Sequence, residues 1–574
     1  MAKSWKMKRS SHLTFIGMIF VWFLTIFYLL STMNEYKTSG NQTDQDRRLS
    51  QVLSSIRDVQ HQIEEIRNVS ELLREIKKLQ GKLLLGSRFH QKQTRPHVEI
   101  GIKGPSLRHE EARRHVETNV DEFWRYMRSK LYKLKDSVKK EDIELLVNAM
   151  LKDGQALHRS AVNDLYDLKN VDDIDKWRLM ESMELGEIIQ KRLNSLQHPK
   201  NCHNTKLFVC EIKNNCGFGC ELHHVVYCLI TGYANNRTVV IPATPWQYAP
   251  SGWETVFQPI GAPCLQEKGI LPERDPHNIL RPDVSSLIGV ENDMRINADY
   301  LPLAVPDDIA DRLLRFHGDP PAWWIGQFVK YLFKFQPSTQ KAIEEGIKKL
   351  NWTTPIAGIH VRRTDKVNHE AGKHEVEEYM VYVEEWYDLL KKRQPVLKKR
   401  VFLASDDPDV IQEIQRKYPD YDFISDQDVS RSANPQNRYQ LTSLYGVLQD
   451  IILLSRCNYL VCTFSSQICR LAYELMQTHN GDASSNVQSL DDMFYFGGQT
   501  EHIMDVREPH DPKEQNEIRL DWNDSVAIAG NHWNGYSKGR NRRTGETGLF
   551  LAYKVKDKLK RAKMPLYNVT DSVV

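Results

Sequence analysis

The spacing of hydrophobic positions changes several times along the chain, and each change predicts a different structure. Leu13–Leu30 carries no charged residue and is long enough to span a membrane as a helix. From Leu49 to Ile66, apolar residues recur at alternating intervals of three and four, which is typical of a coiled coil. A solvated single helix is the alternative, but it would not need two apolar positions in every heptad. We expect a stalk that dimerises.

A stretch rich in glycine and proline, 86–106, separates this stalk from a second helical region. Phe123, Met127, Leu131 and Leu134 share one helical face there, and helical spacing continues to about residue 195. This region holds no residue pattern tied to chemistry, so we expect it to act as a scaffold or an interface.

Short apolar runs and helical stretches alternate in the second half of the chain. A first strand-like run, 239–241, lies in a cysteine-rich part, and helical patterns cover 376–393 and 443–456. The later strand-like runs are 356–361, 401–404, 422–424 and 459–462. Strands separated by helices predict a parallel, doubly wound sheet. Between about 500 and 562, short runs punctuated by glycine predict a small β-barrel.

Polar residues follow each predicted strand of the parallel sheet, and the most informative set is His360–Lys366. The carboxyl ends of parallel strands meet at one edge, where open α/β sheets bind ligands. The residues expected there are Arg362, Arg363, Asp365, Lys366, Asp406, Asp407, Ser465 and Ser466. Paired guanidinium groups suit a diphosphate, and the helix that opens at Ser465–Gln467 offers backbone N–H groups to phosphate. The sequence predicts a nucleotide or nucleotide-sugar site.

The basic residues near the N-terminus predict how the chain is oriented in the membrane. Lys3, Lys6, Lys8 and Arg9 precede the apolar run, which predicts a cytosolic N-terminus and a luminal body. A cleaved signal peptide is the alternative, but bulky rather than small residues end the run, which favours an uncleaved anchor. The net charge of +3 gives no reason to propose a nucleic-acid partner.

Cysteine usage agrees with a luminal body. Six of the nine cysteines fall at positions 202, 210, 216, 220, 228 and 264, and two more are Cys462 and Cys469. A zinc site at Cys216 and Cys220 is the alternative, but no second pair matches it, and an oxidising compartment favours disulfides. We expect four bridges with Cys457 unpaired, and the spacing alone leaves the pairing open.

From about residue 200 to 555, the chain closely resembles the animal core α1,6-fucosyltransferases, which are Golgi enzymes. The motifs that carry the resemblance are Cys216–Cys228, Tyr300–Pro306, Trp323–Leu332, His360–Lys366, Cys462–Gln467, Ser489–Asp492, Gly530–Trp533 and Gly535–Gly539. The arginine pair alone is shared with α1,2- and protein O-fucosyltransferases, whereas the combination of motifs is specific.

The resemblance implies an α/β fold with a GT-B-like catalytic region, whose nucleotide-binding half is the doubly wound sheet. A helical, coiled-coil region precedes it and an SH3-like β-barrel follows. The implied reaction moves L-fucose from GDP-β-L-fucose to O6 of the innermost N-acetylglucosamine of an N-glycan, with inversion and with no cofactor or metal. Expected partners are the N-glycan, GDP-fucose, the Golgi membrane and a second copy of the chain, bound through the coiled-coil stalk or the helices that follow it.

The resemblance also assigns roles to residues. Glu370 is the expected base, ahead of its local rivals Glu377 and Glu378, which fall in a helical stretch. Lys366 orients this carboxylate or relays its proton, and Arg362 grips the β-phosphate in place of a metal. The expected donor-site set is His360, Arg362, Arg363, Asp365, Tyr248, Asp406, Asp407, Asp450, Ser466 and Gln467, with Asp406 and Asp407 fixing the loop. For His360, a satisfied buried histidine is the alternative. The acceptor side holds Tyr379, Asp491, Asp492 and His532.

The implied disulfides are Cys202–Cys264, Cys210–Cys228, Cys216–Cys220 and Cys462–Cys469. Six Asn-x-Ser/Thr sequons occur, of which Asn41 and Asn568, in the expected flexible ends, are the favoured glycosylation sites.

Two rival functions remain at this point: another fucosyltransferase, and a non-catalytic Golgi scaffold. The expected divisions are a tail 1–12, an anchor 13–32, a stem 33–106, a helical region 107–198, catalytic parts 199–354 and 355–498, an SH3-like domain 499–562 and a tail 563–574.

Overall fold

The computed structural model describes residues 104–137, 141–212, 216–242, 245–267, 284–287, 299–364, 372–434, 436–491, 502–531 and 534–567. The predicted cytosolic tail, membrane anchor and coiled coil therefore lie outside the described residues. Among the helices that are described, none is both long and apolar enough to cross a bilayer.

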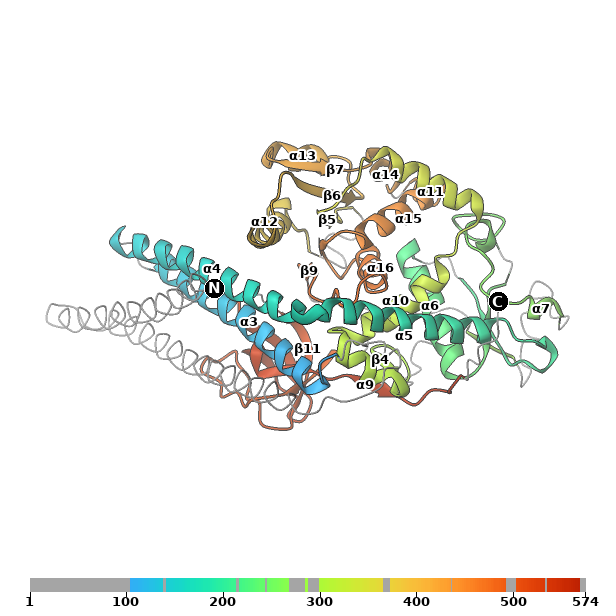
Figure 1. Cartoon of the computed structure of the whole chain (residues 1–574), viewed down its shortest axis with the longest axis horizontal. Helices are drawn as coiled ribbons and strands as arrows, with labels where there is room; N and C mark the ends of the chain where they lie inside the picture. Colours follow the sequence, from blue (N-terminus) through green and yellow to red (C-terminus); the bar gives the residue numbers. More distant parts are fainter. Residues whose placement is uncertain are drawn as a thin grey trace, which may run out of the picture. The chain divides into compact units, whose positions relative to one another are not determined.

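Three long helices open the described part of the chain (Figure 1). They are α3 (Leu107–Ser137), α4 (Glu141–Asn170) and α5 (Ile174–Gln197), with the 3-10 turn η2 (Val171–Asp173) between the last two. Helices α3 and α4 pack side by side, and a Cβ added at Gly154 would come within 2.5 Å of the Trp124 ring. Glycine is needed at that crossing because a larger residue would push the helices apart. The helices confirm the predicted helical region.

A buried ion pair fixes the start of α3 against α5. The Arg178 guanidinium donates to Glu110 at 2.8 Å, and Arg113 donates to the same carboxylate at 3.2 Å. Burial opposes ionisation of Glu110, but the hydrogen bond from His109 and the charges of Arg113 and Arg178 lower its pKa to about 2. Removing one partner of such a pair leaves an uncompensated charge and costs about 3–5 kcal/mol. The helical region is therefore anchored electrostatically as well as by packing.

A small parallel sheet organises the residues that follow α5. Strands β1 (Leu207–Cys210), β2 (Thr238–Val240) and β3 (Val284–Leu287) lie in the order β2-β1-β3, and α6 (Phe218–Ala234) crosses from β1 to β2. The other elements of this half are η3 (Cys202–Asn204), η4 (Trp253–Thr255), α7 (Cys264–Glu267), β4 (Ala304–Pro306), α9 (Asp307–Phe316), α10 (Pro320–Leu332) and α11 (Pro337–Lys349). The run predicted as 239–241 is thus strand β2.

The disulfides follow the pairing that the resemblance implied. They join Cys202 to Cys264, Cys210 to Cys228, Cys216 to Cys220 and Cys462 to Cys469. Cys457 is buried and free, as predicted. Both Cys202–Cys264 and Cys210–Cys228 tie segments of the small sheet together, so they stabilise a part of the chain whose strands are short.

A second parallel sheet of five strands follows, as the alternation of strands and helices predicted. Its order is β7-β6-β5-β8-β9 and all its strands are parallel. The strands are β5 (Ile356–Val361), β6 (Lys399–Ser405), β7 (Tyr421–Ile424), β8 (Tyr459–Cys462) and β9 (Val487–Ser489). The helices are α12 (Val376–Arg393), α13 (Val410–Lys417), α14 (Gln427–Ser432), α15 (Leu441–Ser455) and α16 (Gln467–Met476). Strand β9 was not predicted, because its sequence is polar and contains no apolar run.

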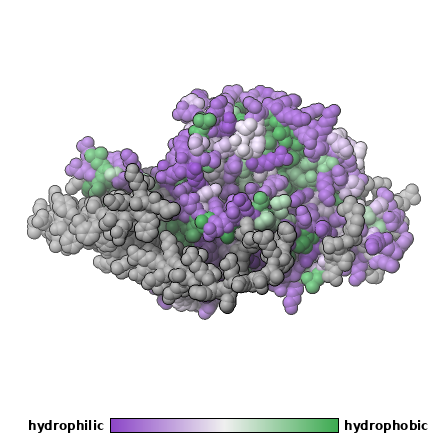
Figure 2. All heavy atoms as spheres, in the orientation of Figure 1, coloured by the Kyte–Doolittle hydropathy of each residue, from purple (hydrophilic) through white to green (hydrophobic). Residues whose placement is uncertain are grey.

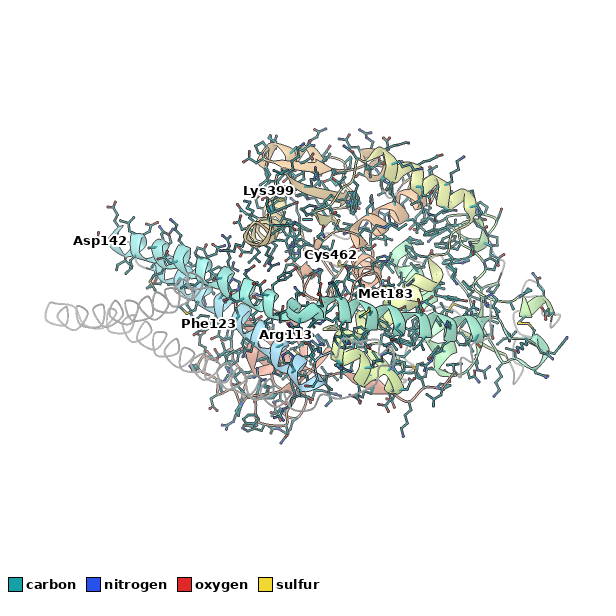
Figure 3. The ribbon with its side chains drawn as sticks, in the orientation of Figure 1. Arg113, Phe123, Asp142, Met183, Lys399 and Cys462 are labelled. Atoms are coloured by element: carbon teal, nitrogen blue, oxygen red, sulfur yellow. A yellow bond between two sulfur atoms is a disulfide. The ribbon has the colours of Figure 1, made fainter. Side chains whose placement is uncertain are left out.

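One hydrophobic core joins the two halves. It includes the fully buried Trp323 and Trp324 of α10 and the apolar faces of α6, α15 and α16. Figure 3 labels Cys462, the last residue of β8, in the interior between these elements. The outer face seen in Figure 2 is mostly hydrophilic, as expected for a protein surrounded by water.

The last part of the chain is rich in antiparallel strands. Strands β10 (His502–Val506), β11 (Ser525–Asn531), β12 (Tyr536–Asn541), β13 (Thr547–Leu551) and β14 (Val555–Asp557) form a sheet in the order β13-β12-β11-β10-β14, with the turn η5 (Ala552–Lys554) before β14. Strand β15 (Lys560–Ala562) leaves this sheet and pairs in parallel with β4. The prediction of short strands is confirmed, whereas the assignment as an SH3 domain stays a prediction.

The predicted tail 563–574 also makes contacts in its described part. The ring of Tyr567 packs at a tilt against that of Tyr233 of α6, with ring centroids 4.7 Å apart, and the Tyr567 hydroxyl donates to the Tyr233 carbonyl at 2.5 Å. The segment after the antiparallel sheet therefore returns to the first half of the molecule. Sequence gave no sign of this, because the contact joins residues more than three hundred positions apart.

Candidate active site

The carboxyl ends of β5, β6 and β8 lie at one edge of the five-stranded sheet. Strand β5 is central and pairs with β6 on one side and β8 on the other. Val361 is in register with Ser405, and Ile359 with Val461, so the three strands end almost level. Neighbouring strands are about 4.8 Å apart. The predicted convergence of strand ends is therefore confirmed for these three strands.

Asp406, which follows β6, holds the backbone that follows β5. Its carboxylate accepts the Arg363 N–H at 2.8 Å, the Thr364 N–H at 3.2 Å and the Thr364 hydroxyl, and Arg362 Nη1 lies 3.1 Å away. Asp406 is itself buried. Asp407 instead accepts the Asp409 N–H at 3.0 Å, near the start of α13. Of the two aspartates expected to fix the loop, Asp406 makes these hydrogen bonds to it, whereas the role of Asp407 in fixing the loop stays a prediction.

The two neighbouring arginines have different surroundings. Arg363 Nη1 donates to Glu413 of α13 at 2.5 Å, and its Nη2 lies 3.3 Å from Glu375 at the start of α12. These contacts tie the loop to two helices and occupy the guanidinium. Arg362 keeps part of its surface exposed beside Asp406, so Arg362 is the better placed of the two to meet a ligand.

The turn between β8 and α16 is shaped by a second aspartate. Asp491 accepts the Ser465 N–H at 3.1 Å, and Ser489 accepts the Phe464 N–H at 2.9 Å. The N–H of Ser466 turns back to the Thr463 carbonyl. Beyond it, the N–H groups of Gln467, Ile468 and Cys469 have no acceptor among the described residues. This helix start can therefore receive a phosphate, although the Ser465 N–H, expected to be exposed, is already used.

The start of α6 meets the start of α16. A Cβ added at Gly219 would lie 2.8 Å from the Gln467 side chain and 3.1 Å from its carbonyl carbon. Tyr248 accepts the Phe218 N–H at 2.7 Å through its hydroxyl, whereas the Gly219 N–H has no acceptor in the described part of the chain. Two helix N-termini thus present unpaired N–H groups side by side, which favours an anion.

Several buried polar atoms near these strand and helix ends, Arg363 Nε among them, have no hydrogen-bond partner within the described residues, and two of them belong to uncharged side chains of the expected donor site. These two are Nδ1 of His360, in β5, and Oε1 of Gln467. Burial lowers the pKa of His360 to about 4, and the charge of Arg362 adds to this while Asp406 opposes it. A neutral imidazole with one free nitrogen is suited to a hydrogen bond with a neutral ligand group. An unpaired buried polar atom costs free energy until a ligand or water meets it.

Asp450 belongs to α15, and Tyr248 packs against Tyr439 just before that helix. Burial, together with the negative charge of Asp426, raises the pKa of Asp450 well above its usual range. No hydrogen bond or ion pair of Asp450 is present among the described residues, and none joins it to His360. The Tyr248 ring lies 5.5 Å from that of Tyr439, just before α15, and Tyr439 is 44% exposed. Burial raises the pKa of Tyr248.

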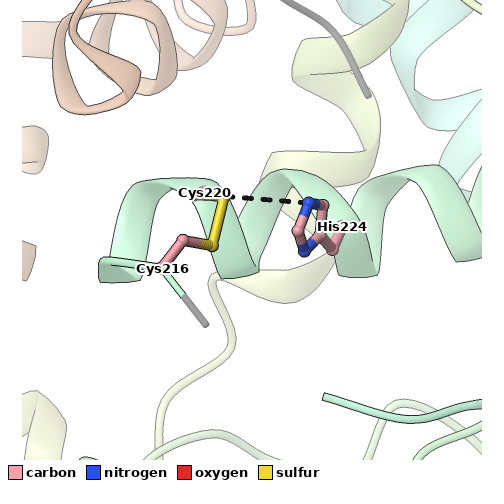
Figure 4. Close-up of side chains that lie close together, drawn as sticks. All are labelled: Cys216, Cys220 and His224. Atoms are coloured by element: carbon pink, nitrogen blue, oxygen red, sulfur yellow. Dashed lines mark hydrogen bonds between the residues drawn. A yellow bond between two sulfur atoms is a disulfide. The ribbon is translucent and has the colours of Figure 1, made fainter. Parts of the chain in front are cut away.

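The zinc alternative at Cys216 and Cys220 does not fit this structure. The two sulfurs form a disulfide, and Cys220 Sγ lies 3.7 Å from Nε2 of His224, one turn further along α6 (Figure 4). These three residues form the one potential metal-binding cluster of histidine, cysteine and carboxylate side chains in the described part of the chain. Disulfide sulfurs are not thiolate ligands, so the oxidised chain cannot hold zinc there.

Several predicted residues lie outside the described part of the chain: Asp365, Lys366, Glu370, Asp492 and His532. Of the expected acceptor-side residues that are described, Tyr379 is buried in the core between α12 and the sheet. Burial, and secondarily the charge of Asp491, raises its pKa. Asp491 shapes the turn before α16, as described above. Tyr379 and Asp491 thus lie near the end of β9 rather than on an open surface. Their predicted roles in binding the acceptor stay predictions.

Sequence reasoning missed Gly219 and Tyr439. Gly219 was visible in Cys216–Cys220, where two glycines precede an apolar helix, but that motif was considered only for metal or disulfide chemistry. Tyr439 stands alone in a polar loop, so no sequence pattern could have singled it out. Both became visible only when the first half of the chain was placed against the second.

Together these groups can bind a diphosphate and stabilise it as a leaving group. Arg362 supplies a cation, the starts of α6 and α16 supply unpaired N–H groups, and His360 and Asp450 can meet neutral hydrogen-bonding groups. Such an arrangement stabilises negative charge that develops when a diphosphate departs. Its donors are fixed by helices and by Asp406, so little reorganisation is needed.

A family model described as alpha-(1,6)-fucosyltransferase N- and catalytic domains matches residues 4–495. The chain is 44% identical to a Drosophila melanogaster alpha-(1,6)-fucosyltransferase over 468 residues, covering 81% of this chain and 75% of that one. It is 34% identical to a Caenorhabditis elegans alpha-(1,6)-fucosyltransferase over 552 residues, covering 93% and 96%. Among solved structures, NodZ alpha-1,6-fucosyltransferase co-crystallised with GDP superposes with a TM-score of 0.29 and 15% identity, covering 47% of this chain and 92% of that one.

We predict that Asp406→Ala loosens the loop after β5. Loss of a buried carboxylate that accepts three hydrogen bonds should lower the free energy of unfolding by about 2–4 kcal/mol. It should also speed hydrogen exchange at the Arg363 and Thr364 amides at least about tenfold, since each amide loses its acceptor. Exchange followed by mass spectrometry measures this. Asp407→Ala is the matched control and should cost about 1 kcal/mol; equal exchange in both variants would contradict the role of Asp406.

Proposed function

The chain belongs to the alpha-(1,6)-fucosyltransferase family, and from this membership we propose that it transfers L-fucose from GDP-β-L-fucose to O6 of the innermost N-acetylglucosamine of N-glycans. It is a glycosyltransferase. The observation that carries the proposal on the structural side is the meeting of two helix N-termini, together with Arg362, which follows β5, the neighbour of the strand that precedes α16. That arrangement suits a nucleoside diphosphate better than any other common ligand.

We place the diphosphate of GDP between the start of α6 and the start of α16. The N–H groups of Gly219, Gln467, Ile468 and Cys469 would then meet phosphate oxygens, and Arg362 would balance the charge of the β-phosphate. Ser466 and Gln467 would complete this contact. Guanine and ribose would face His360, Asp450 and Tyr248. His360 supports this placement, because its buried Nδ1 lacks a partner within the described residues.

The proposed chemistry is a single in-line displacement. Glu370 would take the proton from the acceptor O6, which then forms a bond to the anomeric carbon of fucose as the bond to GDP breaks. The electron pair of the broken bond leaves with GDP, and the anomeric centre inverts. Lys366 would orient Glu370, and Asp365 and Arg363 would keep the loop in place. A base and a stabilised leaving group are the two requirements of such a step.

We propose that the acceptor glycan lies on the side of Tyr379, Asp491, Asp492 and His532. The antiparallel sheet β10–β14 is proposed to be an SH3-like domain that helps hold this glycan. SH3 domains usually bind proline-rich peptides, but a luminal domain cannot meet cytosolic ligands. Glu546 also departs from the arginine often found before Thr-Gly-Leu in SH3 sequences. Glycan is therefore the favoured ligand of this sheet.

Membrane attachment and assembly are proposed together. Residues 13–32 would anchor the chain in the Golgi membrane with residues 33–574 in the lumen, which protease protection of intact vesicles tests. We propose a homodimer formed through the helical region. Exposed large apolar residues are concentrated on α3, α4, α5 and the turn η2: Tyr132, Leu145, Leu157, Tyr166, Leu168, Val171, Leu179, Met180 and Met183. Figure 2 shows hydrophobic residues at the free end of the α3–α4 pair, where Leu145 is 63% exposed.

We expect the soluble chain to transfer fucose only to O6 of the innermost N-acetylglucosamine when it is given GDP-fucose and a panel of defined N-glycans. Mass spectrometry with linkage analysis locates the new bond. Arg362→Ala should lower kcat at least about a hundredfold, because the leaving GDP loses its fixed cation. Transfer at the wild-type rate by this variant would refute the mechanism, and fucose on serine, threonine or another sugar would support the rival fucosyltransferase. No transfer by the wild type would favour the scaffold alternative.

Transfer should continue when EDTA is present in excess over all divalent ions. In this proposal Arg362 and backbone N–H groups stabilise the leaving diphosphate, which is the task that a metal ion performs in other enzymes. The initial rate with and without EDTA is the measurement. A loss of activity that added manganese restores would show that the charge balance proposed here is incomplete.

The fragment 93–574 should sediment as a dimer. These residues form one compact unit, so the fragment can be studied without the stalk. A double change, Met180→Glu with Met183→Glu, should shift it to monomer, because two buried carboxylates would oppose association. Leu397→Glu is the matched control, since Leu397 is 98% exposed and lies elsewhere. A fragment that is monomeric before any substitution would place dimerisation in the stalk instead.

A further inference from the structure

His223 links the two helices whose N-termini meet at the proposed diphosphate site. It lies on α6, one turn after Gly219, and its Nδ1 is 2.8 Å from the Gly219 carbonyl. Its Nε2 is 3.0 Å from Oε2 of Glu474 on α16. One side chain therefore contacts the glycine that touches Gln467 and, at the same time, the helix that Gln467 begins.

The chemistry of these contacts requires a retained proton. A carbonyl oxygen only accepts hydrogen bonds, so Nδ1 of His223 must carry a hydrogen. An ionised carboxylate also only accepts, so the second contact needs either a hydrogen on Nε2 or a protonated Glu474. Both arrangements hold the same two protons between the ring and the carboxyl group. With a hydrogen on Nε2 and an ionised Glu474, the His223–Glu474 contact is a charge-assisted bond, which is stronger than one between neutral groups.

Burial makes this contact consequential. Both side chains are almost completely enclosed, with 4% of His223 and 1% of Glu474 exposed. Neither residue reaches the reacting groups in the mechanism proposed above, and hydrophobic packing alone would fill the same space. A buried polar pair that could be replaced by apolar residues is a weak source of stability but a strong source of geometric specificity. The His223–Glu474 pair sets the position of α6 relative to α16 along the axis of α16.

We propose that His223 and Glu474 are positioning residues that hold the starts of α6 and α16 in the register needed to bind the donor diphosphate. The hydrogen bond to the Gly219 carbonyl orients the peptide next to the Gly219 N–H, which has no acceptor among the described residues. The bond to Glu474 ties that peptide to α16, whose first N–H groups face the same anion. Without the His223–Glu474 hydrogen bond, the N–H groups at the two helix starts would still be present but would no longer be aligned with the diphosphate. This inference rests on the proposed donor site.

Three variants separate positioning from general stability. Glu474→Gln keeps a hydrogen-bonding group of the same shape, since its amide can donate to Nε2 of a neutral His223. Glu474→Leu removes the hydrogen bond between the two helices and leaves Nε2 of His223 without this partner. The double variant His223→Leu with Glu474→Leu also removes the link but leaves neither an unpaired ring nor an unpaired carboxylate, so its stability should recover. His224→Leu is the matched control, because the adjacent histidine contacts Cys220 and not α16.

Calorimetric titration with GDP, thermal unfolding, and the KM and kcat for GDP-fucose are measured for each protein. We expect GDP affinity and KM to stay within about threefold of wild type in Glu474→Gln and His224→Leu. Both Glu474→Leu and the double variant should bind GDP at least about tenfold more weakly, with a raised KM for GDP-fucose. The key expectation is that the double variant regains thermal stability without regaining GDP affinity.

Recovery of GDP affinity together with stability in the double variant would show that the pair is merely structural and would overturn the proposal. A tenfold loss in Glu474→Gln despite normal stability would equally overturn it, since the link survives in that variant. If the wild-type protein does not bind GDP, the proposed function fails and not this inference alone. The wild-type titration therefore separates the two failures.

Discussion

The buried carboxylate of Asp406 fixes the backbone that leaves the central strand β5. Two amides, one hydroxyl and the guanidinium of Arg362 converge on it. Because β5 and β6 are parallel neighbours that end almost level, a residue directly after β6 can reach the residues directly after β5. The Asp406 carboxylate thereby contributes to the direction of Arg362, and with it to the charge offered to a ligand. Arg363 reinforces the arrangement from outside through Glu413.

A second constraint acts between the two halves of the molecule. Helices α6 and α16 approach closely enough that only glycine fits at position 219. This contact brings two helix N-termini together, and each N-terminus favours negative charge on its own. The large core around α10, α15 and α16 keeps these helices in contact. Packing in the interior thus places two helix starts that each favour negative charge at one edge of the sheet, although the chain has little net charge.

Most of the fold could be predicted because its signals are local. The apolar run 356–361, the helical spacing of 376–393 and the polar residues after each strand each depend on near neighbours, and the structure has the expected elements there. Strand β9 escaped prediction because its residues are polar and it becomes a strand only by pairing with β8. The return of β15 to β4 escaped for the same reason: partner strands so far apart leave no pattern in either segment.

For the site, the sequence by itself determined which chemical groups are available: two arginines, a histidine and an aspartate at strand ends, and a helix start at Ser466. It also carried the family resemblance, because that depends on residue identity at ordered positions. Only the tertiary structure decided which of these groups face one another. In the folded chain Arg363 contacts Glu413, and Asp407 accepts a hydrogen bond in the turn before α13. Gly219 and Tyr439 lie next to Gln467 and Tyr248 of the expected donor site. The physical reason is that direction and contact arise from packing between residues distant in sequence, which local patterns do not encode.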